Sequence, residues 1–302
     1  MYVIVPHDID YAEVTSSLPE DPAPVWSAAS TYAKGAVVRV GTALYTSLTG
    51  SNRGNNPVAT SSGTEAAWRR SGASNRAALF DGHVHTQSVA PEETPLVVGV
   101  PWRRATGFAL LNISGAAQLT AVITAANGEV IAERTYDLLD GVDNWYDYFA
   151  YNFSFVRDVV ELDLCGFLSG TLTLTLTGSL PAAGHLAVGD LHEPGATLYG
   201  AVAELINYSV VETNDFGVTE IVERVSAKRY ECQLFLPPSR TDAVFDLFDK
   251  IRATPCVWIG DNAASADGGH SHLTAFGLYT RARLTDEGPC QATYDMEITG
   301  LI

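Results

Sequence analysis

The chain has 302 residues, of which 46% are hydrophobic and 18% charged, so it can form two or three globular domains and is not disordered. Its formal net charge of -17 gives a surface that repels phosphate backbones and anionic lipid headgroups, which argues against nucleic acid and membrane partners. The apolar start, Met1–Pro6, is too short for a signal peptide, and no apolar run reaches the roughly 20 residues of a membrane span. These features predict a chain made in the cytoplasm, without a signal peptide and without membrane insertion.

Residues 1–24 open with a short strand-like run and then become polar and proline-rich, which predicts an N-terminal arm or linker. Residues 25–75 predict a small β domain. Within it, Val37–Val40 and Ala43–Tyr45 flank Gly41-Thr42, a spacing that favours a tight hairpin. The stretch that follows is rich in Gly, Ser and Asn and is typical of a loop.

Residues 76–190 are dominated by strand patterns and predict a jelly-roll-like β-sandwich. Segments 118–124 and 129–136 flank Asn127-Gly128, a dipeptide that accepts the positive φ angles of a type I′ hairpin turn. Threonine and leucine alternate over Thr171–Thr177, so this strand has one apolar and one hydroxyl-bearing face. Such a strand belongs to an antiparallel sheet that is buried on one side.

Residues 191–302 predict an α+β domain, with strand-like runs at 218–236, 256–259, 273–283 and 291–301. One helix is expected at about residues 240–252, where Ser239 and Asp242 resemble a capping box and Pro255 ends the helical pattern. Its apolar stripe comprises Val244, Leu247, Phe248 and Ile251. The predicted fold class is therefore mainly β and multidomain: a small carbohydrate-binding-like module, a sandwich and a C-terminal α+β domain with one main helix.

Four aromatic residues of the small domain are candidates for a binding surface: Trp26, Tyr32, Tyr45 and Trp68. Aromatic rings stack on the apolar C–H face of sugars, so such residues on a small β scaffold suit a glycan-binding surface. A domain of this size also needs large aromatic residues to form a core at all. The residues alone leave both interpretations open.

The order Trp26, Tyr32–Gly35, Val37–Gly41, Tyr45, Pro57 and Trp68 resembles the small chitin- and cellulose-binding modules of secreted glycoside hydrolases. The resemblance covers about residues 25–70 and implies a carbohydrate-binding-module fold, with the four aromatic residues as its binding candidates. The chain departs from the family at Thr46–Thr49, where family members often carry exposed, sugar-stacking tryptophans. The fold can therefore be kept while the binding face differs.

A second resemblance covers nearly the whole chain and is carried by six separate blocks in one order. The blocks are Ser74–Gly82, Asp143–Phe149, Tyr199–Ile206, Ser226–Arg229, Arg252–Gly260 and Glu297–Ile302. They resemble a family of phage and prophage proteins that are encoded among tail genes and described as tail or baseplate components. The resemblance implies a virion protein of the tail tip or baseplate. Its partners would be other tail proteins and further copies of itself in a ring.

A third set of aromatic residues lies between residues 145 and 155. This run could form a second glycan platform or a subunit interface, where Trp and Tyr are enriched, and the interface candidates are Trp145, Tyr146 and Tyr148. The alternate residues Phe149, Tyr151, Phe153 and Phe155 would share one strand face and fill the sandwich core.

Metal and cofactor signals are weak. The pairs His83/His85 and His270/His272 could each supply two ligands, but a catalytic zinc site needs a third and usually a general base. Asp140–Asn144 lacks the full calcium-loop pattern and is read as a turn. The four cysteines, Cys165, Cys232, Cys256 and Cys290, form no CxxC pair and are expected to be buried free thiols. No metal and no cofactor is predicted.

No nucleophile elbow and no phosphate-binding loop is present, and the carboxylates near residue 140 do not define a catalytic pair. The chain is therefore not expected to be an enzyme, and no catalytic residue is assigned. The leading hypothesis is a structural tail-tip or baseplate protein that contacts host-surface polysaccharide through its small module. The alternatives are a dedicated glycan receptor-binding protein and, third, a polysaccharide depolymerase.

Overall fold

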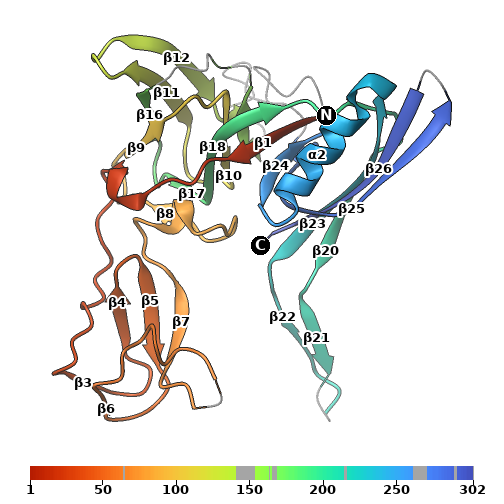
Figure 1. Ribbon diagram of the computed structural model, residues 1–302. Coiled ribbons are helices and arrows are strands. Elements are labelled where there is room, and N and C mark those ends of the chain that lie inside the picture. Colours follow the sequence, from red (N-terminus) through yellow and green to blue (C-terminus); the bar gives the residue numbers. More distant parts are fainter. Residues whose placement is uncertain are drawn as a thin grey trace, which may run out of the picture.

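The structure, a computed structural model, describes residues 1–63, 65–140, 154–162, 164, 169–213, 216–260, 271–288 and 291–301. The fold is mainly β, with one main helix near the C-terminus among the described residues, as the sequence predicts. Figure 1 shows a body made of two packed β units. A small module, residues 25–75, projects from this body. A two-stranded arm, formed by β21 (Val210–Thr213) and β22 (Thr219–Val222), projects from it as well.

One ten-stranded sheet runs through both units of the body and forms its framework. Nine strands follow in the order β15 (Val159–Glu161), β10 (Gly107–Leu111), β18 (His185–His192), β1 (Tyr2–Pro6), β24 (Cys256–Ile259), β25 (Thr274–Gly288), β26 (Gln291–Gly300), β23 (Ser226–Leu236) and β19 (Ala196–Thr197). The tenth, β20 (Val202–Asn207), also pairs with β23. The expected sandwich and the expected α+β domain, with their boundary at residues 190 and 191, therefore share a single sheet.

Strand β1 joins the two parts of this sheet, because it pairs antiparallel with β18 on one side and with β24 on the other. Ile4 lies opposite Leu191 and Val257, and its side chain is fully buried. Met1 is also buried, and its amino group donates a hydrogen bond to the Gly195 carbonyl oxygen at 2.8 Å. The sequence predicts an N-terminal arm or linker for residues 1–24, but their first residues form a central strand of the body. Figure 1 shows this strand in red between β18 and β24.

A second sheet covers the sandwich end of the first. Its strands are β12 (Val130–Asp137), β11 (Gln118–Ala125), β16 (Gly170–Thr177), β9 (Leu96–Trp102) and β2 (Thr15–Ser16), in that order. Leu172, Leu174 and Leu176 of β16 are buried in a core shared with Phe108 and Val188 of the large sheet. This confirms the alternating pattern predicted for the strand and shows a sandwich of two facing sheets.

The predicted hairpin around Asn127-Gly128 is confirmed, but its turn is not of type I′. Gly128 has a φ angle of 84°, whereas Asn127 is not among the non-glycine residues with positive φ. The register between β11 and β12 shifts after Ile123. A single positive φ together with this shift is the geometry of a turn closed by a β-bulge.

Helix α2 (Thr241–Ile251) packs on the C-terminal part of the large sheet, where the sequence predicts it. Its residues Val244, Phe248 and Ile251 are buried, so the predicted apolar stripe is confirmed. The capping box is wrong, because Ser239 lies in a 3-10 turn (η3, Pro238–Arg240) and the N-cap position is held by Arg240 without a side-chain cap. The turn continues directly into the helix, and the Thr241 hydroxyl donates to the Pro238 carbonyl oxygen at 2.8 Å.

The small module is an insertion between β2 and the sandwich. It contains a three-stranded sheet of β4 (Val37–Val40), β5 (Ala43–Ser47) and β7 (Trp68–Ala73), and a two-stranded one of β3 (Thr31–Tyr32) and β6 (Asn52–Arg53). Its two ends meet, since the Asn75 amide donates to the Asp21 carboxylate. Glu20 pairs with Arg39 of the module and with Arg76 beyond it, at 2.9 and 3.8 Å.

The other elements are short. They are η1 (Tyr11–Glu13), η2 (Ala78–Phe80), η4 (Ser271–Leu273), β8 (Ser88–Val89) with β17 (Ala182–Ala183), β13 (Leu139–Asp140) with β14 (Ser154–Phe155), and β21 (Val210–Thr213) with β22 (Thr219–Val222). No helix of the described ranges is long and apolar enough to span a bilayer.

Shortening one side chain of β1 tests whether this strand unites the body. Ile4→Ala is expected to lower the free energy of unfolding by about 2–5 kcal/mol, because it leaves a cavity in a fully buried position. Urea unfolding followed by tryptophan fluorescence and by circular dichroism should give one coincident transition. Val130→Ala, at a residue 54% exposed on β12, is the matched control and should change stability by less than about 0.5 kcal/mol. Separate transitions for the sandwich and the C-terminal unit would contradict the shared sheet.

Candidate functional site

The four aromatic candidates of the small module mainly build its core. Trp68 is fully buried and Tyr45 is 7% exposed, and both pack with Val38. The Trp68 indole Nε1 donates to the Asn55 carbonyl oxygen at 3.0 Å, which fixes the neighbouring loop. A sugar ring cannot stack on these two side chains while the module is folded.

Trp26 and Tyr32 are half-buried at the edge of the same core. The Tyr32 ring meets the Trp68 ring edge-on, with centroids 5.3 Å apart, and the Tyr32 hydroxyl accepts a hydrogen bond from the Ser27 amide at 2.7 Å. The Trp26 Nε1 is buried and has no hydrogen-bond partner among the described residues. The structure therefore gathers all four candidates in one cluster, and only Trp26 and Tyr32 keep some exposed surface.

The proposed interface residues Trp145, Tyr146 and Tyr148 lie outside the described residues, as do Phe149, Tyr151 and Phe153. Phe155, the last member of that alternating set, is 41% exposed in β14. It is not part of the sandwich core, so the core interpretation is wrong at this position.

A groove of about 770 Å³ lies between the sandwich and the C-terminal unit. The sandwich contributes Asn112, Arg157 and Asp158, and the C-terminal unit contributes Lys228 and Arg229. Residues from the start of β23 thus approach the segment before β15, although these strands lie at opposite ends of the large sheet. The large sheet therefore curls around this groove.

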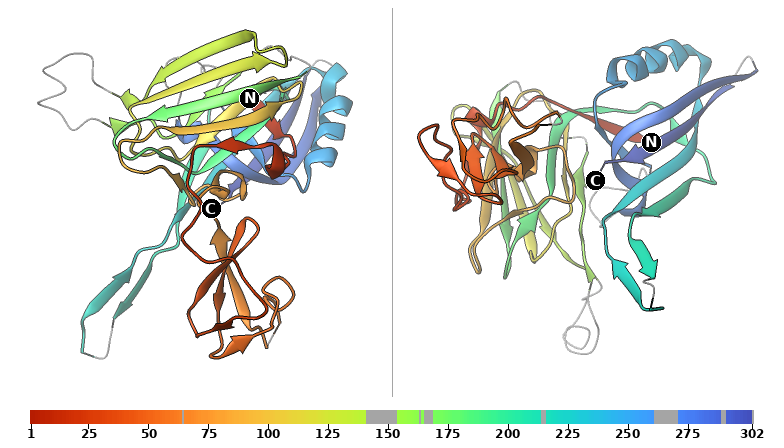
Figure 2. Two further views of the ribbon diagram at one scale, coloured as in Figure 1. Left: turned by 90° about the vertical axis from the view of Figure 1, so that its left-hand side faces the viewer. Right: turned by 90° about the horizontal axis from the view of Figure 1, so that it is seen from below.

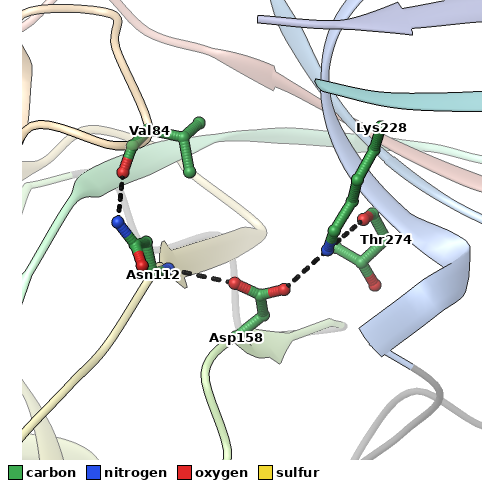
Figure 3. Close-up of polar contacts among 5 residues, drawn as sticks. All are labelled: Val84, Asn112, Asp158, Lys228 and Thr274. Carbon is green, nitrogen blue, oxygen red and sulfur yellow. Dashed lines mark hydrogen bonds and ion pairs between the residues drawn. The ribbon is translucent and has the colours of Figure 1, made fainter. Parts of the chain in front are cut away.

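A polar network at Asp158 and Lys228 closes the curl (Figure 3). The Lys228 Nζ donates to Asp158 Oδ2 at 3.1 Å and to the Thr274 carbonyl oxygen at 3.2 Å. The other Asp158 oxygen accepts the Asn112 backbone amide at 3.0 Å, and the Asn112 side chain donates to the Val84 carbonyl oxygen at 2.8 Å. Asp158 is only 10% exposed, whereas Lys228 is 39% exposed.

This network suits a structural role better than a chemical one, because both oxygens of Asp158 already accept hydrogen bonds and Lys228 already donates two. The sequence did not reveal it. Lys228 belongs to the block Ser226–Arg229 that carries a resemblance, but nothing near Arg157-Asp158 marks that carboxylate as a partner. Only the curl of the sheet brings these distant residues together.

Two exposed histidines, His83 and His85, lie near the buried His185. His83 and His85 are exposed with stacked rings 6.4 Å apart, whereas His185 is 7% exposed and its ring lies 4.2 Å from that of Phe276. Burial and the nearby His83 lower the pKa of His185 to about 4, and a backbone hydrogen bond at Leu79 opposes this shift. His270 lies outside the described residues.

The described residues hold no cluster of three or more His, Cys, Asp or Glu side chains that could bind a metal ion. Cys232 and Cys256 are buried free thiols, as predicted, and burial raises their pKa values to about 11 and about 12. Cys165 and Cys290 lie outside the described residues.

The arm is a pair of strands that are exposed along most of their length. It consists of β21 and β22, and it extends β20 and β23 away from the body as a narrow ribbon (Figure 2). Val211 and Ile221 lie opposite each other and are 64% and 69% exposed. Directly opposite residues share a face, so Val210 and Val222 lie on the other face, next to the exposed pair Glu212 and Glu220. Both faces of the arm therefore present apolar side chains to solvent.

Compared with known proteins, the chain matches no family model and gives no significant match to a curated protein.

Removing the buried carboxylate of the network should destabilise the protein. Asp158→Ala is expected to lower the free energy of unfolding by about 1–3 kcal/mol, because the Asn112 amide loses its acceptor in a partly buried place. Lys228→Met should cost about 1 kcal/mol or less, since the lysine is 39% exposed. Urea unfolding measures both. Asp249→Ala removes an exposed ion pair to Arg252 and is the control; an equal effect of the two aspartate variants would refute the role of Asp158.

The buried His185 should make stability depend on pH. Its folded pKa lies below the ordinary value of 6.5, so the unfolded chain binds the proton more readily, and stability is lost as the pH falls from about 6.5 towards 4. Between pH 7.5 and 5.0 this group should cost about 2 kcal/mol of unfolding free energy. His185→Asn should reduce that loss relative to the parent protein, as urea unfolding at the two pH values can show. The exposed His85→Asn serves as control, and equal pH slopes for the parent protein and both variants would contradict the assignment.

Proposed function

We propose that the chain is a structural component of a phage tail tip or baseplate that assembles in several copies. The observation that carries this proposal is the arm, a ribbon with exposed apolar side chains on both faces that projects from the described part of the body. Exposed apolar surface of this kind marks protein–protein contact. The polar network in the groove adds a structural role rather than a chemical one for its ionisable residues.

The positions of the six resemblance blocks agree with a role in assembly. Tyr199–Ile206 and Ser226–Arg229 form the paired strands at the base of the arm, β20 and β23. Arg252–Gly260 includes β24, which binds β1, and Glu297–Ile302 ends β26. Ser74–Gly82 joins the module to the sandwich, and Asp143–Phe149 lies outside the described residues. The blocks thus concentrate at the arm's base and at the joins between units.

Contact with host-surface polysaccharide is a second function, proposed for the small module. It is favoured by the module's place as a projecting insertion with its own core, held at adjacent ends by Asp21 and Asn75. Because Trp68 and Tyr45 lie in that core, recognition would use Trp26, Tyr32 and polar groups rather than a broad aromatic platform. In the alternative of a dedicated receptor-binding protein, glycan recognition by this module would be the main function of the chain.

The structural role predicts that the chain is a constituent of the phage particle. We expect mass spectrometry of purified particles to find the chain in several copies, and immunogold labelling to place it at one end of the tail. The major tail-tube protein of the same particles is the quantitative standard.

Absence from purified particles would refute the structural role. Binding of the free chain to host envelope would then favour the receptor-binding alternative. For that comparison the module must be excised internally, between Asp21 and Asn75, because removing the chain from residue 1 would also delete β1.

A further inference from the structure

We propose that the arm of one copy docks on the small module of a neighbouring copy, against the outer face of the sheet β4-β5-β7. This inference rests on the proposed function, since it takes the chain to assemble in several copies. It deepens that function by naming the two surfaces that meet.

The arm needs a partner for two physical reasons. An isolated two-stranded ribbon is marginally stable in water, yet β21 and β22 expose apolar residues on both faces. In addition, Glu212 lies directly opposite Glu220, and like charges in that position destabilise a strand pair. A surface that fits this face would combine apolar contact for Val222, which is 45% exposed, with positive charge for the two glutamates.

The arm is acidic along its length. Residues 207–226 contain Glu212, Asp215, Glu220 and Glu223 but a single basic residue, Arg224. An acidic ribbon in a chain with a formal net charge of -17 is repelled by most of the surface of another copy. Only a basic region of that copy can receive it.

The small module is such a region. Residues 25–75 contain the basic residues Lys34, Arg39, Arg53, Arg69 and Arg70 but a single acidic residue, Glu65. Arg39 is held by Glu20, whereas the exposed Lys34, Arg53, Arg69 and Arg70 have no ion-pair partner among the described residues. The module is therefore a basic region of an acidic chain.

The outer face of the module sheet matches the arm in detail. Val37, Thr46 and Arg69 lie in one row across β4, β5 and β7, and residues in one row share a face. Val37 is 41% exposed, so the row offers an apolar residue, a hydroxyl and an arginine. The corresponding face of the arm offers the pair Val210 and Val222 and, next to it, the pair Glu212 and Glu220.

The contact joins different copies. Within one copy the arm and the module project from the body at separate places, and the views of Figures 1 and 2 show them apart. A contact between two different surfaces is head-to-tail, and its repetition gives a ring when the rotation closes. A polyanionic glycan would satisfy only the module's cations and leave the arm uncovered, so a second copy accounts for both surfaces.

Charge reversal tests this contact on the full chain. Arg69→Glu reverses the charge on the outer face of the module sheet, and Glu212→Arg with Glu220→Arg makes the arm basic. Each variant alone should associate at least about tenfold more weakly than the parent chain at low salt, because repulsion replaces attraction. An equimolar mixture should regain association, since each arm then meets an opposite module. Sedimentation velocity measures association, and circular dichroism checks folding.

Lys250→Glu, on α2, makes the same change in net charge as the module variant and should leave association unchanged. A parent chain that stays monomeric at high concentration and low salt would overturn the proposal, as would a mixture without recovery. Unchanged association of the module variant, together with lost binding of alginate as a polyanionic probe, would assign the module to a glycan instead. These outcomes do not decide the structural role, which is tested separately by mass spectrometry of purified particles.

Discussion

The pairing of β1 with strands on both of its sides is the constraint on which the rest of the structure depends. β1 binds β18, which belongs to the sandwich, and β24, which belongs to the C-terminal unit. Its first residues are buried on both faces, Val3 towards the core under α2 and Ile4 towards the opposite one. Gly189 of β18 allows the close approach, because a Cβ there would lie 1.9 Å from the Val5 carbonyl oxygen. Closing this sheet requires contacts between residues more than 180 positions apart, which favours slow folding.

The place of β1 also determines what projects from the body. The chain leaves β1, adds β2 to the second sheet and then makes the module before it returns at Asn75. Because both ends of the module are held beside Glu20, the module is a tethered insertion and not a free N-terminal domain. On the other side, the curl of the large sheet brings Lys228 to Asp158. The arm leaves the body directly beyond that ion pair.

Local patterns predicted local structure well. The alternation of Thr171–Thr177 and the apolar stripe of α2 report burial on one face, and both are confirmed. The predictions of turn type and helix cap were wrong, because the backbone had alternatives at both places. A bulged turn replaced type I′ at Gly128, and a 3-10 turn replaced the capping box at Ser239. These alternatives differ by little energy, so the residues alone do not choose between them.

Long-range structure could not be predicted, because no local pattern encodes which strands pair. The run Met1–Pro6 reads as a short strand at any place in a fold, and only its two partners make it central. For the same reason Asp158 carried no signal of its contact with Lys228. The aromatic residues of the module illustrate a different limit. Trp68 suits a core and a sugar platform equally by its chemistry, and only its complete burial decides for the core.

Several features of the arm and of the small module are unfavourable within a single copy of the chain. Natural sequences are locally consistent with their own fold, and departures concentrate where function requires them. Here the departures are the like-charged pair Glu212 and Glu220, the exposed Val211 and Ile221, and the unpaired arginines of the module. The proposed contact would place the two glutamates and Val222 of the arm against the basic sheet face, whereas Val211 and Ile221 lie on the opposite face of the arm. One copy keeps the arm and the module apart, so the proposed contact requires a second copy to bring the acidic and the basic surface together.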